Sequence, residues 1–348
     1  MNRGKFCRTV IVGLIALSLV AFSKGSAFAS ETEWPAVVSF GTAVSGSSYH
    51  ALGLSWAGVV GKSIGHKISA QATGGSSANM ALLKEGKIHL AQANTQDDFL
   101  AARGIQRYKE RGKADIRLMM CGYDVNWSVF ARKAAGIKGF PDLKGKNCYF
   151  DLPPAPILMF AAMVVLEAYG LTEKDIRVKA WSSWSEVKSA LAEGKMDAAS
   201  GPGSMGVKPH PSINEMFQTH DMILLSPSEK AQEYVMKKYP FFGKGVVKAG
   251  TYRNQNSDCN AVSLPISWIT RPDVPDEWIY TMVKATWENL DKLSVSNAAF
   301  KSFILKRAAR SFAIPYHPGA IKYYKEAGVW TAEMDAKQKK VLEELKKW

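Results

Sequence analysis

Two short segments combine glycine with serine and threonine, which can hold a small anion through backbone amides and hydroxyls. They are residues 41–48, Gly-Thr-Ala-Val-Ser-Gly-Ser-Ser, and residues 73–77, Thr-Gly-Gly-Ser-Ser. Each follows an apolar, strand-like run and precedes a segment with helical spacing. The first turn of a helix has unpaired N–H groups and partial positive charge, which favour an anion. Either loop alone could simply cap its helix, but two at strand ends predict an anion site without Lys or Arg.

The candidate ligand-binding residues lie in these two segments, beside them and at the next strand end. In this part of the chain they are Thr42, Ser45, Gly46, Ser47, Ser48, Tyr49, Thr73, Gly74, Gly75, Ser76, Ser77, Asn79, Gln92 and Asn94. Four further candidates follow, namely Trp127, Asp151, Trp181 and Gly203. For the tryptophans, packing in the core is the alternative, since large aromatic side chains dominate cores as well.

Two nucleotide-binding patterns occur, and neither has the context that it needs. Residues 201–206 fit G-x-G-x-x-G, but prolines at 209 and 211 oppose the helix that must open at once. We therefore interpret this segment as a loop facing a cleft. Residues 58–63 resemble the end of a phosphate-binding loop, but they lie inside a predicted helix and the first glycine is replaced by Trp56.

Residues for catalysis or metal binding are not grouped in the sequence. The hydrolase pattern G-x-S-x-G is absent, since Pro202 replaces the glycine before Ser204. None of the six histidines has a partner at metal-ligand spacing. Asp97 and Asp98 open a predicted helix, where they would serve its dipole. We therefore expect a protein that is not an enzyme and that needs no metal or cofactor.

Alternating strands and helices position these residues and predict an α/β fold. The expected strands are residues 37–40, 68–72, 88–93, 116–122, 147–151, 176–181, 196–200, 222–225 and 261–270. Thr95 and Asp98 form a capping-box pattern for a helix that ends at Gly104, and Ser183 and Glu186 form another for a helix that ends at Gly194.

One internal similarity indicates two lobes of the same kind rather than one sheet. Residues 82–93 and residues 190–200 both run from a helix through glycine and lysine into a short strand. We predict a first lobe of residues 30–128 plus 261–348 and a second lobe of residues 129–260. The chain would cross between them near residues 129–130 and 255–265.

The N-terminus has the three parts of a secretory signal peptide. A basic start precedes an apolar run over residues 10–22, and Ala27-Phe28-Ala29 fits a cleavage site. We therefore expect export to the periplasm with cleavage after Ala29, leaving 319 of the 348 residues. An uncleaved anchor helix is the alternative, although the run is short for spanning a bilayer.

Charge and cysteine content restrict the partners of the mature chain. The net charge of +14 falls to +10 without the four basic residues of the signal peptide, Arg3, Lys5, Arg8 and Lys24. Lysines are scattered, and the densest stretch, residues 337–347, is interrupted by acids, so we expect no nucleic-acid partner. Cys121, Cys148 and Cys259 are an odd set of three, which we expect to be small buried residues.

The two glycine-rich segments, with Tyr49 and Asn79, resemble the N-terminal half of TAXI-type solute receptors of tripartite ATP-independent periplasmic (TRAP) transporters. The most specific similarity is at residues 314–328, Ile-Pro-Tyr-His-Pro-Gly-Ala-Ile-Lys-Tyr-Tyr-Lys-Glu-Ala-Gly, and residues 166–170 also fit. The resemblance covers essentially the whole mature chain. It implies a type II-like periplasmic-binding-protein fold with two lobes, a central cleft and a hinge, and TRAP membrane subunits driven by an ion gradient as partners. Related receptors bind glutamate-like amino acids or dicarboxylates.

One departure from that family changes the expected ligand. Where the family has a Gly/Ser-rich loop after the first strand of the second lobe, this chain has Asp151-Leu-Pro-Pro-Ala-Pro156. Proline has no N–H donor, so we expect the first lobe to hold the carboxylate. A less polar part of the ligand would lie against Pro153, Pro154, Trp127 or Trp181.

The expected function is capture of a small organic anion, a carboxylate or an amino acid, by a monomer that delivers it to TRAP subunits. Two alternatives remain open at this point. The chain could serve an ATP-driven importer, or it could present its ligand to a sensor kinase.

Overall fold

Ten strands form a single mixed sheet in the computed structural model, which describes residues 33–153 and 156–348. The strands are β1 (Val38–Gly41), β2 (Ile68–Gln71), β3 (Leu90–Asn94), β4 (Arg117–Arg132), β5 (Asn147–Asp151), β6 (Arg177–Ala180), β7 (Ala198–Met205), β8 (Met222–Leu225), β9 (Gly243–Val247) and β10 (Cys259–Thr270). Trp34–Trp348 form one compact unit. The predicted signal peptide, residues 1–29, lies outside the described residues.

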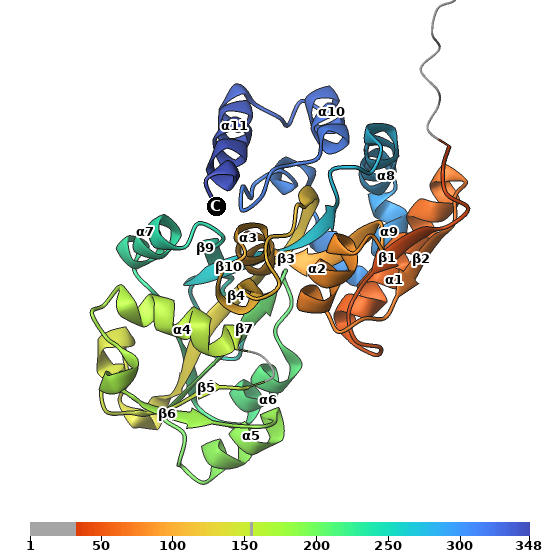
Figure 1. Ribbon diagram of the computed structural model, residues 1–348. Helices are drawn as coiled ribbons and strands as arrows, with labels where there is room; N and C mark the ends of the chain where they lie inside the picture. The colour runs from red at the N-terminus through yellow and green to blue at the C-terminus, as the bar shows by residue number, and fades with distance from the viewer. Residues whose placement is uncertain (1–32, 154–155) are drawn as a thin grey trace, which may run out of the picture. The chain divides into compact units, whose positions relative to one another are not determined.

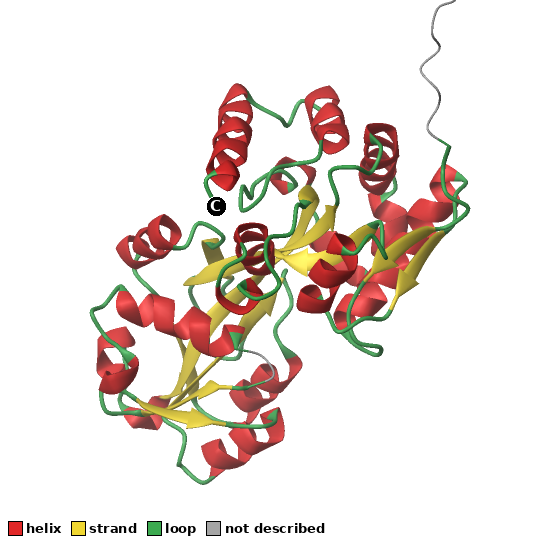
Figure 2. Ribbon diagram, viewed as in Figure 1, coloured by secondary structure: helices red, strands yellow, loops and turns green. Residues whose placement is uncertain are grey.

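Helices pack on both faces of this sheet (Figure 2). They are α1 (Ser48–Ile64), α2 (Ser76–Lys84), α3 (Thr95–Arg103), α4 (Ile157–Glu167), α5 (Trp184–Ala192), α6 (Pro211–Thr219), α7 (Glu229–Lys238), α8 (Asp276–Glu288), α9 (Leu290–Ser296), α10 (Pro318–Glu326) and α11 (Ala332–Lys346). Within the described residues, every helix is too short or too polar to cross a membrane. The predicted α/β class is confirmed.

Two long strands, β4 and β10, connect the parts of the sheet (Figure 1). They pair antiparallel along much of their length, from Val262 opposite Trp127 to Thr270 opposite Arg117. The sequence predicted one chain crossing at about residue 129, and β4 continues through that point. The expectation of two separate sheets is wrong, because β4 pairs with β10 on one side and with β7 further along.

The strand order occurs twice, which agrees with a type II-like fold. The first part of the sheet has the order β2-β1-β3-β10-β4, and the pairings of the second part give β6-β5-β7-β4-β8. In both, the first three strands are parallel and the fourth is antiparallel to them. We call β1 to β3 with their helices the first repeat, and β5 to β7 with their helices the second repeat.

The two repeats also share their register, with an offset of 108 residues. Gly41 of β1 pairs with Ala91 of β3, and Tyr149 of β5 pairs with Ala199 of β7, so both numbers rise by 108. The same offset relates α2, which spans 76–84, to α5, which spans 184–192. The internal similarity seen in the sequence therefore corresponds to a structural repeat, which allows positions in the two repeats to be compared directly.

Buried apolar side chains form three clusters around the sheet. One packs β1 to β3, α1 and the C-terminal helices, and it includes Trp56 and Trp268. The other two lie around β5 to β8 and contain Phe150 and Phe130 respectively. Half-buried Trp127 of β4 packs against all three clusters. The predicted lobe boundaries remain a prediction.

The three cysteines of the described chain are free and buried, as the sequence predicted. Burial raises the pKa of Cys148 to about 12 and that of Cys259 to about 11, so both remain neutral thiols. They therefore act as small packing residues.

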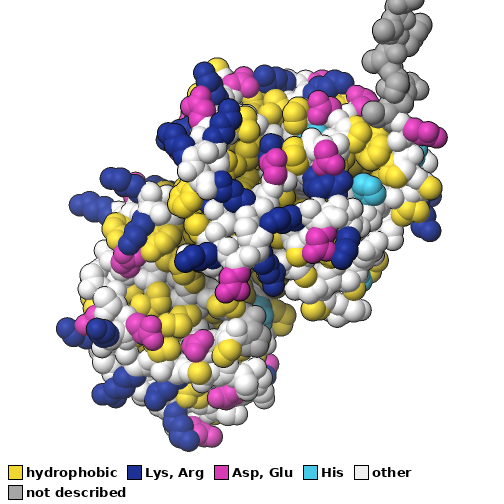
Figure 3. Space-filling view, viewed as in Figure 1, with side chains coloured by type: hydrophobic (Ala, Val, Ile, Leu, Met, Phe, Trp, Pro, Cys, Tyr) yellow, Lys and Arg dark blue, Asp and Glu magenta, His cyan; other side chains and the backbone are white. Residues whose placement is uncertain are grey.

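On one face of the molecule, basic side chains lie among acidic ones. On the face shown in Figure 3, Lys and Arg are interspersed with Asp and Glu. This mixture is typical of a solvated surface and differs from the basic stripe of a nucleic-acid-binding protein.

Candidate functional site

Asn79 joins the carboxyl ends of two strands in the first repeat. Its side chain is fully buried, and Nδ2 donates to the carbonyl oxygens of Thr42 and Gln92, each at 2.7 Å. The hydroxyl of Thr73 also donates to the Thr42 carbonyl, at 3.0 Å. The segments 41–48 and 73–77 therefore lie side by side at the end of the sheet.

The start of α1 presents hydroxyls without a competing acid. Ser47 caps the helix by accepting a hydrogen bond from the His50 amide at 3.2 Å, and the first turn has no Asp or Glu. Thr42 is buried, with its hydroxyl 2.7 Å from Nδ1 of His50, whereas Ser45, Gly46 and Ser48 are exposed.

Tyr49, in the same turn, is half-buried overall. Its ring meets the ring of Tyr123 edge-on at 6.5 Å. Burial of the phenol group, together with Tyr123, raises the pKa of Tyr49 well above its usual value. Tyr49 therefore remains a neutral hydrogen-bond donor.

The start of α2 is more open still. Its N-cap, Gly75, has φ of +85°, a region that favours glycine, and it has no side chain to cap the helix. The first turn contains no acid, and the amides of residues 76–78 have no partner among the described residues. Gly74 is exposed, and Gly75, Ser76 and Ser77 are half-buried. Three free amides and two hydroxyls can therefore donate to one anion.

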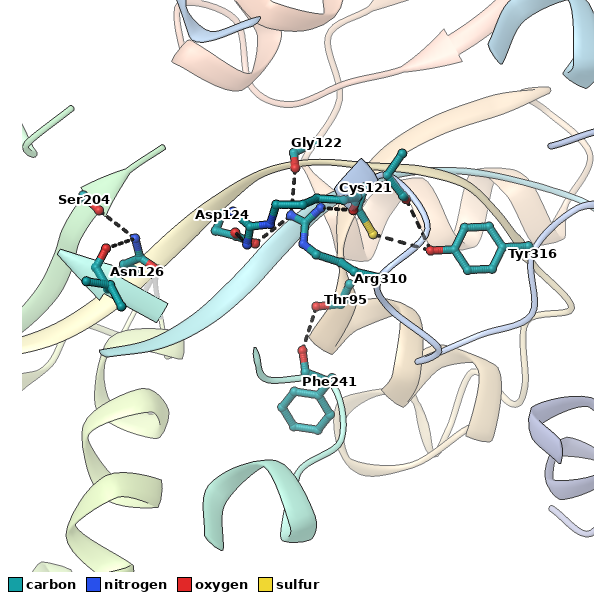
Figure 4. A network of polar contacts seen from close by, with 12 residues as sticks. Thr95, Cys121, Gly122, Asp124, Asn126, Ser204, Phe241, Arg310 and Tyr316 are labelled. Atoms are coloured by element: carbon teal, nitrogen blue, oxygen red, sulfur yellow. Dashed lines mark hydrogen bonds and ion pairs between the residues drawn. The ribbon is translucent and has the colours of Figure 1, made fainter. Parts of the chain in front are cut away.

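The end of β3 contributes the last two candidates of the first repeat. Asn94 donates to the hydroxyl of Ser76 at 3.2 Å and caps α3 by accepting from the Asp97 amide at 3.0 Å. Gln92 is buried, and neither its Oε1 nor its Nε2 has a partner among the described residues. The predicted cap of α3 was one residue too late: Thr95 is inside the helix, and its hydroxyl donates to the carbonyl of Phe241 (Figure 4).

The two acids at the start of α3 have roles that the sequence did not predict. Asp97 accepts a hydrogen bond from the Tyr108 hydroxyl at 2.5 Å and pairs with Arg107. Asp98 is fully buried, and neither of its carboxylate oxygens has a partner among the described residues. Burial raises the pKa of Asp98 well above its usual value, and neighbouring Asp97 adds to the shift. The expectation that both merely serve the helix dipole is therefore wrong.

Three of the corresponding positions in the second repeat are apolar. With the offset of 108, Thr73 corresponds to Trp181 and Ser76 to Trp184, whose rings are 4.8 Å apart. Asn79 corresponds to Val187, which is fully buried in an apolar cluster. Where the first repeat has hydroxyl and amide groups, the second therefore has indole rings and an aliphatic side chain.

The start of α5 is closed by its own acid. Ser183 caps the helix, as predicted, by accepting from the Glu186 amide at 3.3 Å. The Glu186 carboxylate accepts from the amide and hydroxyl of Ser182 at 2.8 and 2.9 Å, which lowers the pKa of Glu186. An anionic ligand would meet a negative charge there.

The remaining candidates are spread over the second repeat and β4. Asp151 is half-buried at the end of β5, and its carbonyl accepts from the Trp181 amide at 2.9 Å. Trp181 is 3% exposed, so most of its surface packs in the core. Trp127 is half-buried in β4. Pro153 is exposed, while Pro154 and Ala155 lie outside the described residues.

Gly203 is not in a loop, and that interpretation was wrong. It lies inside β7 and is buried, and its carbonyl accepts from the Tyr252 hydroxyl at 2.8 Å. A Cβ atom at this position would lie 2.3 Å from Oγ of Ser128 on the neighbouring strand. The glycine therefore serves close strand packing, and we no longer expect a cleft-facing contact from it.

Two residues of this region were not among the eighteen candidates. His50 contacts the Thr42 hydroxyl, and the ring of Trp184 packs in a tilted arrangement against the rings of Trp181 and His210, with centroids 4.8 Å apart in each pair. A search for pairs at metal-ligand spacing passes over His50, because its partner is a hydroxyl eight residues earlier. Trp184 would have been found by carrying the first-repeat candidates across the internal similarity.

Comparison with known proteins places the chain in a sequence family. The model of the NMT1-like family matches residues 40–328. This range begins inside β1 and includes the rest of both repeats and all eighteen candidate residues.

Several solved structures are similar to this chain at low sequence identity. The alkanesulfonate-binding protein SsuA from Xanthomonas axonopodis pv. citri, bound to MOPS, is 15% identical, with coverage of 88% of this chain and 94% of that chain and a TM-score of 0.42. The periplasmic aliphatic sulphonate binding protein SsuA from Escherichia coli is 14% identical (88% and 83%, TM-score 0.43). XAC2383 from Xanthomonas citri, bound to ATP, is 12% identical (89% and 99%, TM-score 0.46). These TM-scores are too low to support an inference about ligand or mechanism.

Proposed function

The chain belongs to the NMT1-like family, and we propose that it is an exported solute-binding protein that captures a small organic anion and catalyses no reaction. The observation that carries this proposal is the pair of helix N-termini, α1 and α2, that lie together at the strand ends without an acid in either first turn. Free amides and hydroxyls at such a place bind a carboxylate through charge-assisted hydrogen bonds.

The second repeat suggests the other end of the ligand. Trp181 and Trp184 occupy the positions of the first-repeat hydroxyls, and Glu186 closes the helix that could have held a second carboxylate. A ligand with one anionic group and an apolar or aromatic body fits this difference better than glutamate or a dicarboxylate. The first repeat would hold the carboxylate, and the second would pack against the body.

Capture would use the two long strands as a hinge. A ligand that contacts both repeats at once would favour a closed form over an open form. The shift toward the closed form is set by how much more tightly the ligand binds the closed form than the open one. The closed form would then dock on membrane subunits at the periplasmic face.

The transporter partner remains our prediction from the sequence. TRAP subunits are proposed on the resemblance at residues 314–328, with an ATP-driven importer or a sensor kinase as the alternatives. Genes for membrane subunits beside this gene, without a gene for an ATPase, would support TRAP subunits as the partner. Loss of uptake rather than of signalling on deletion of the gene would exclude the kinase.

Native mass spectrometry of the protein purified from its source, followed by calorimetry, tests the ligand class. We expect a co-purified organic acid, and we expect aromatic or branched monocarboxylates to bind at least about tenfold more tightly than glutamate, because burying an apolar body adds at least 1.4 kcal/mol. Tight glutamate binding without any preference for apolar acids would contradict this ligand class.

A further inference from the structure

A cavity of about 400 Å³ lies beside the crossing strand β4. Its walls come from Asp124 and Asn126 of β4, from the end of β7, from β9 and the turn after it, and from residues 301–307. A cavity of this size is large enough for a small organic molecule. None of the eighteen residues expected to bind ligand is part of its lining.

The lining of this cavity is strongly basic. Its charged side chains are Lys244, Lys248, Lys301, Arg307 and Asp124. The single acid is already engaged, because the Asp124 carboxylate, 9% exposed, pairs with both Arg307 and Arg310. The cavity therefore has an excess of positive charge that its own acid does not neutralise.

Arg307 and Arg310 are held in place by backbone and side-chain contacts. Arg310 donates to Asp124 at 2.6 Å and to the Gly122 carbonyl at 2.8 Å, and Figure 4 shows Arg310 and Asp124 pointing toward one another. The buried Nε of Arg310 has no partner among the described residues. A second hollow of about 200 Å³ adjoins Arg310 and shares Lys244 and Arg307 with the cavity.

The lysines are available to a ligand. Lys244 pairs with Glu233 at 3.2 Å and Lys248 with Asp258 at 2.7 Å, and all four of these side chains are about half exposed or more. Exposed pairs of this kind contribute about 0–1 kcal/mol and exchange easily. Among the described residues, no carboxylate pairs with Lys301.

Hydroxyl and apolar groups complete the lining. Ser204, Thr251 and Ser302 supply hydroxyls, and Val207 and Ile304 are 73% and 49% exposed. An inorganic anion would leave these two aliphatic side chains uncovered, whereas the carbon skeleton of an organic anion would contact them.

We propose that this cavity is a second anion site, which binds a small organic molecule with two or more carboxylates. Several cations around one hollow favour a multivalent anion, whereas the strand-end site offers the first turns of two helices to a single carboxylate. A ligand here would touch β7, β9 and the C-terminal segment together, so it would also influence how these elements move relative to β4.

Calorimetry with citrate tests this site, using Lys301→Glu and the matched control Lys306→Glu. Both lysines are exposed and carry the same charge, but only Lys301 lines the cavity. We expect citrate to bind the wild type, Lys301→Glu to weaken binding by about tenfold or more, and Lys306→Glu to change it by less than about twofold. Inorganic phosphate should bind much more weakly than citrate.

Three results would overturn the second site. These are no citrate binding by the wild type, equal weakening in the two lysine variants, or phosphate binding as tight as citrate. A third variant, Ser77→Asp at the start of α2, separates the two sites: citrate binding lost there but kept in Lys301→Glu would place citrate at the strand ends and exclude the cavity. Citrate binding that survives Ser77→Asp while monocarboxylates fail to bind the wild type would leave the second site standing and contradict the proposed function.

Discussion

At the scale of single residues, Asp98 has the most unusual environment in the described chain. Its carboxyl is fully buried without a hydrogen-bond partner among the residues that the structure describes, and the nearby Ser267 hydroxyl offsets only part of the effect of burial on the pKa of Asp98. The folded chain therefore keeps a proton on Asp98 at pH values where the unfolded chain, with a pKa near 3.9, has released it. Stability from this group is fully present below about pH 4 and falls as the pH rises toward the raised value.

Asp98→Asn should remove this pH dependence while keeping the shape of the side chain. We expect the thermal midpoint of the wild type to fall more between pH 5 and pH 8 than that of the variant, so that the variant gains relative stability as the pH rises. Asp115→Asn is the control, since Asp115 is exposed and pairs with Arg117. If the thermal midpoints of Asp98→Asn and of the wild type changed identically with pH, the raised pKa of Asp98 would be contradicted.

Residue roles are where the sequence was least informative. The cluster around Asn79 could be anticipated, because glycine and hydroxyl residues were close in sequence and sat at strand ends. The burial of Asp98 could not be anticipated from the sequence, because it depends on β10, which lies about 170 residues further along the chain. The strand at Gly203 was also missed, because its glycines and proline oppose a strand. The close approach of Ser128 to Gly203, and of Ile213 and Trp184 to Gly201, becomes known only from the structure.

At the scale of elements, the contrast between α2 and α5 makes a matched experiment possible. Ser77 and Ser185 are both the second residue of their helix and correspond through the offset of 108. Aspartate at either position adds a charge that suits a helix N-terminus and should change stability by less than about 1 kcal/mol. Ser77→Asp, however, places a carboxylate beside the free amides of α2, next to Arg111, which donates to the Ser77 hydroxyl at 3.1 Å.

We therefore expect Ser77→Asp to weaken binding of the captured anion by about tenfold or more, and Ser185→Asp to leave it within about twofold. Calorimetry measures both, and urea denaturation confirms that both variants are folded. An equal effect of the two substitutions on affinity would contradict the assignment of the anion site to the start of α2. Full affinity in Ser77→Asp would mean that the anion binds elsewhere.

The order of the elements was largely predictable. Strand 147–151 was predicted with the bounds observed, and the caps at Ser183 and Gly104 were found because capping is local chemistry. The length of β4 was not predictable, because its second half, Val125–Arg132, is held as a strand by pairing with the distant strands β7, β8 and β10. Local pattern identifies an element, but long-range pairing decides where it ends.

At the scale of the whole molecule, the two repeats explain both the similarity of the parts and their different chemistry. After the offset of 108, the strand register and the bounds of α2 and α5 are equal in the two repeats. The polar positions differ: hydroxyls, an amide and open amides in the first repeat correspond to indoles, a valine and a closed cap in the second. We infer that this asymmetry orients an anionic head toward the first repeat and a less polar body toward the second.

A crystal structure of the complex with the organic acid that co-purifies would test this account most directly, by showing where the anionic group lies. The account predicts a carboxylate within hydrogen-bond distance of the amides of Ser76 and Ser77, with the rest of the molecule near Trp181 and Trp184. A single carboxylate found only in the cavity beside Lys301, with the start of α2 uncovered, would contradict it.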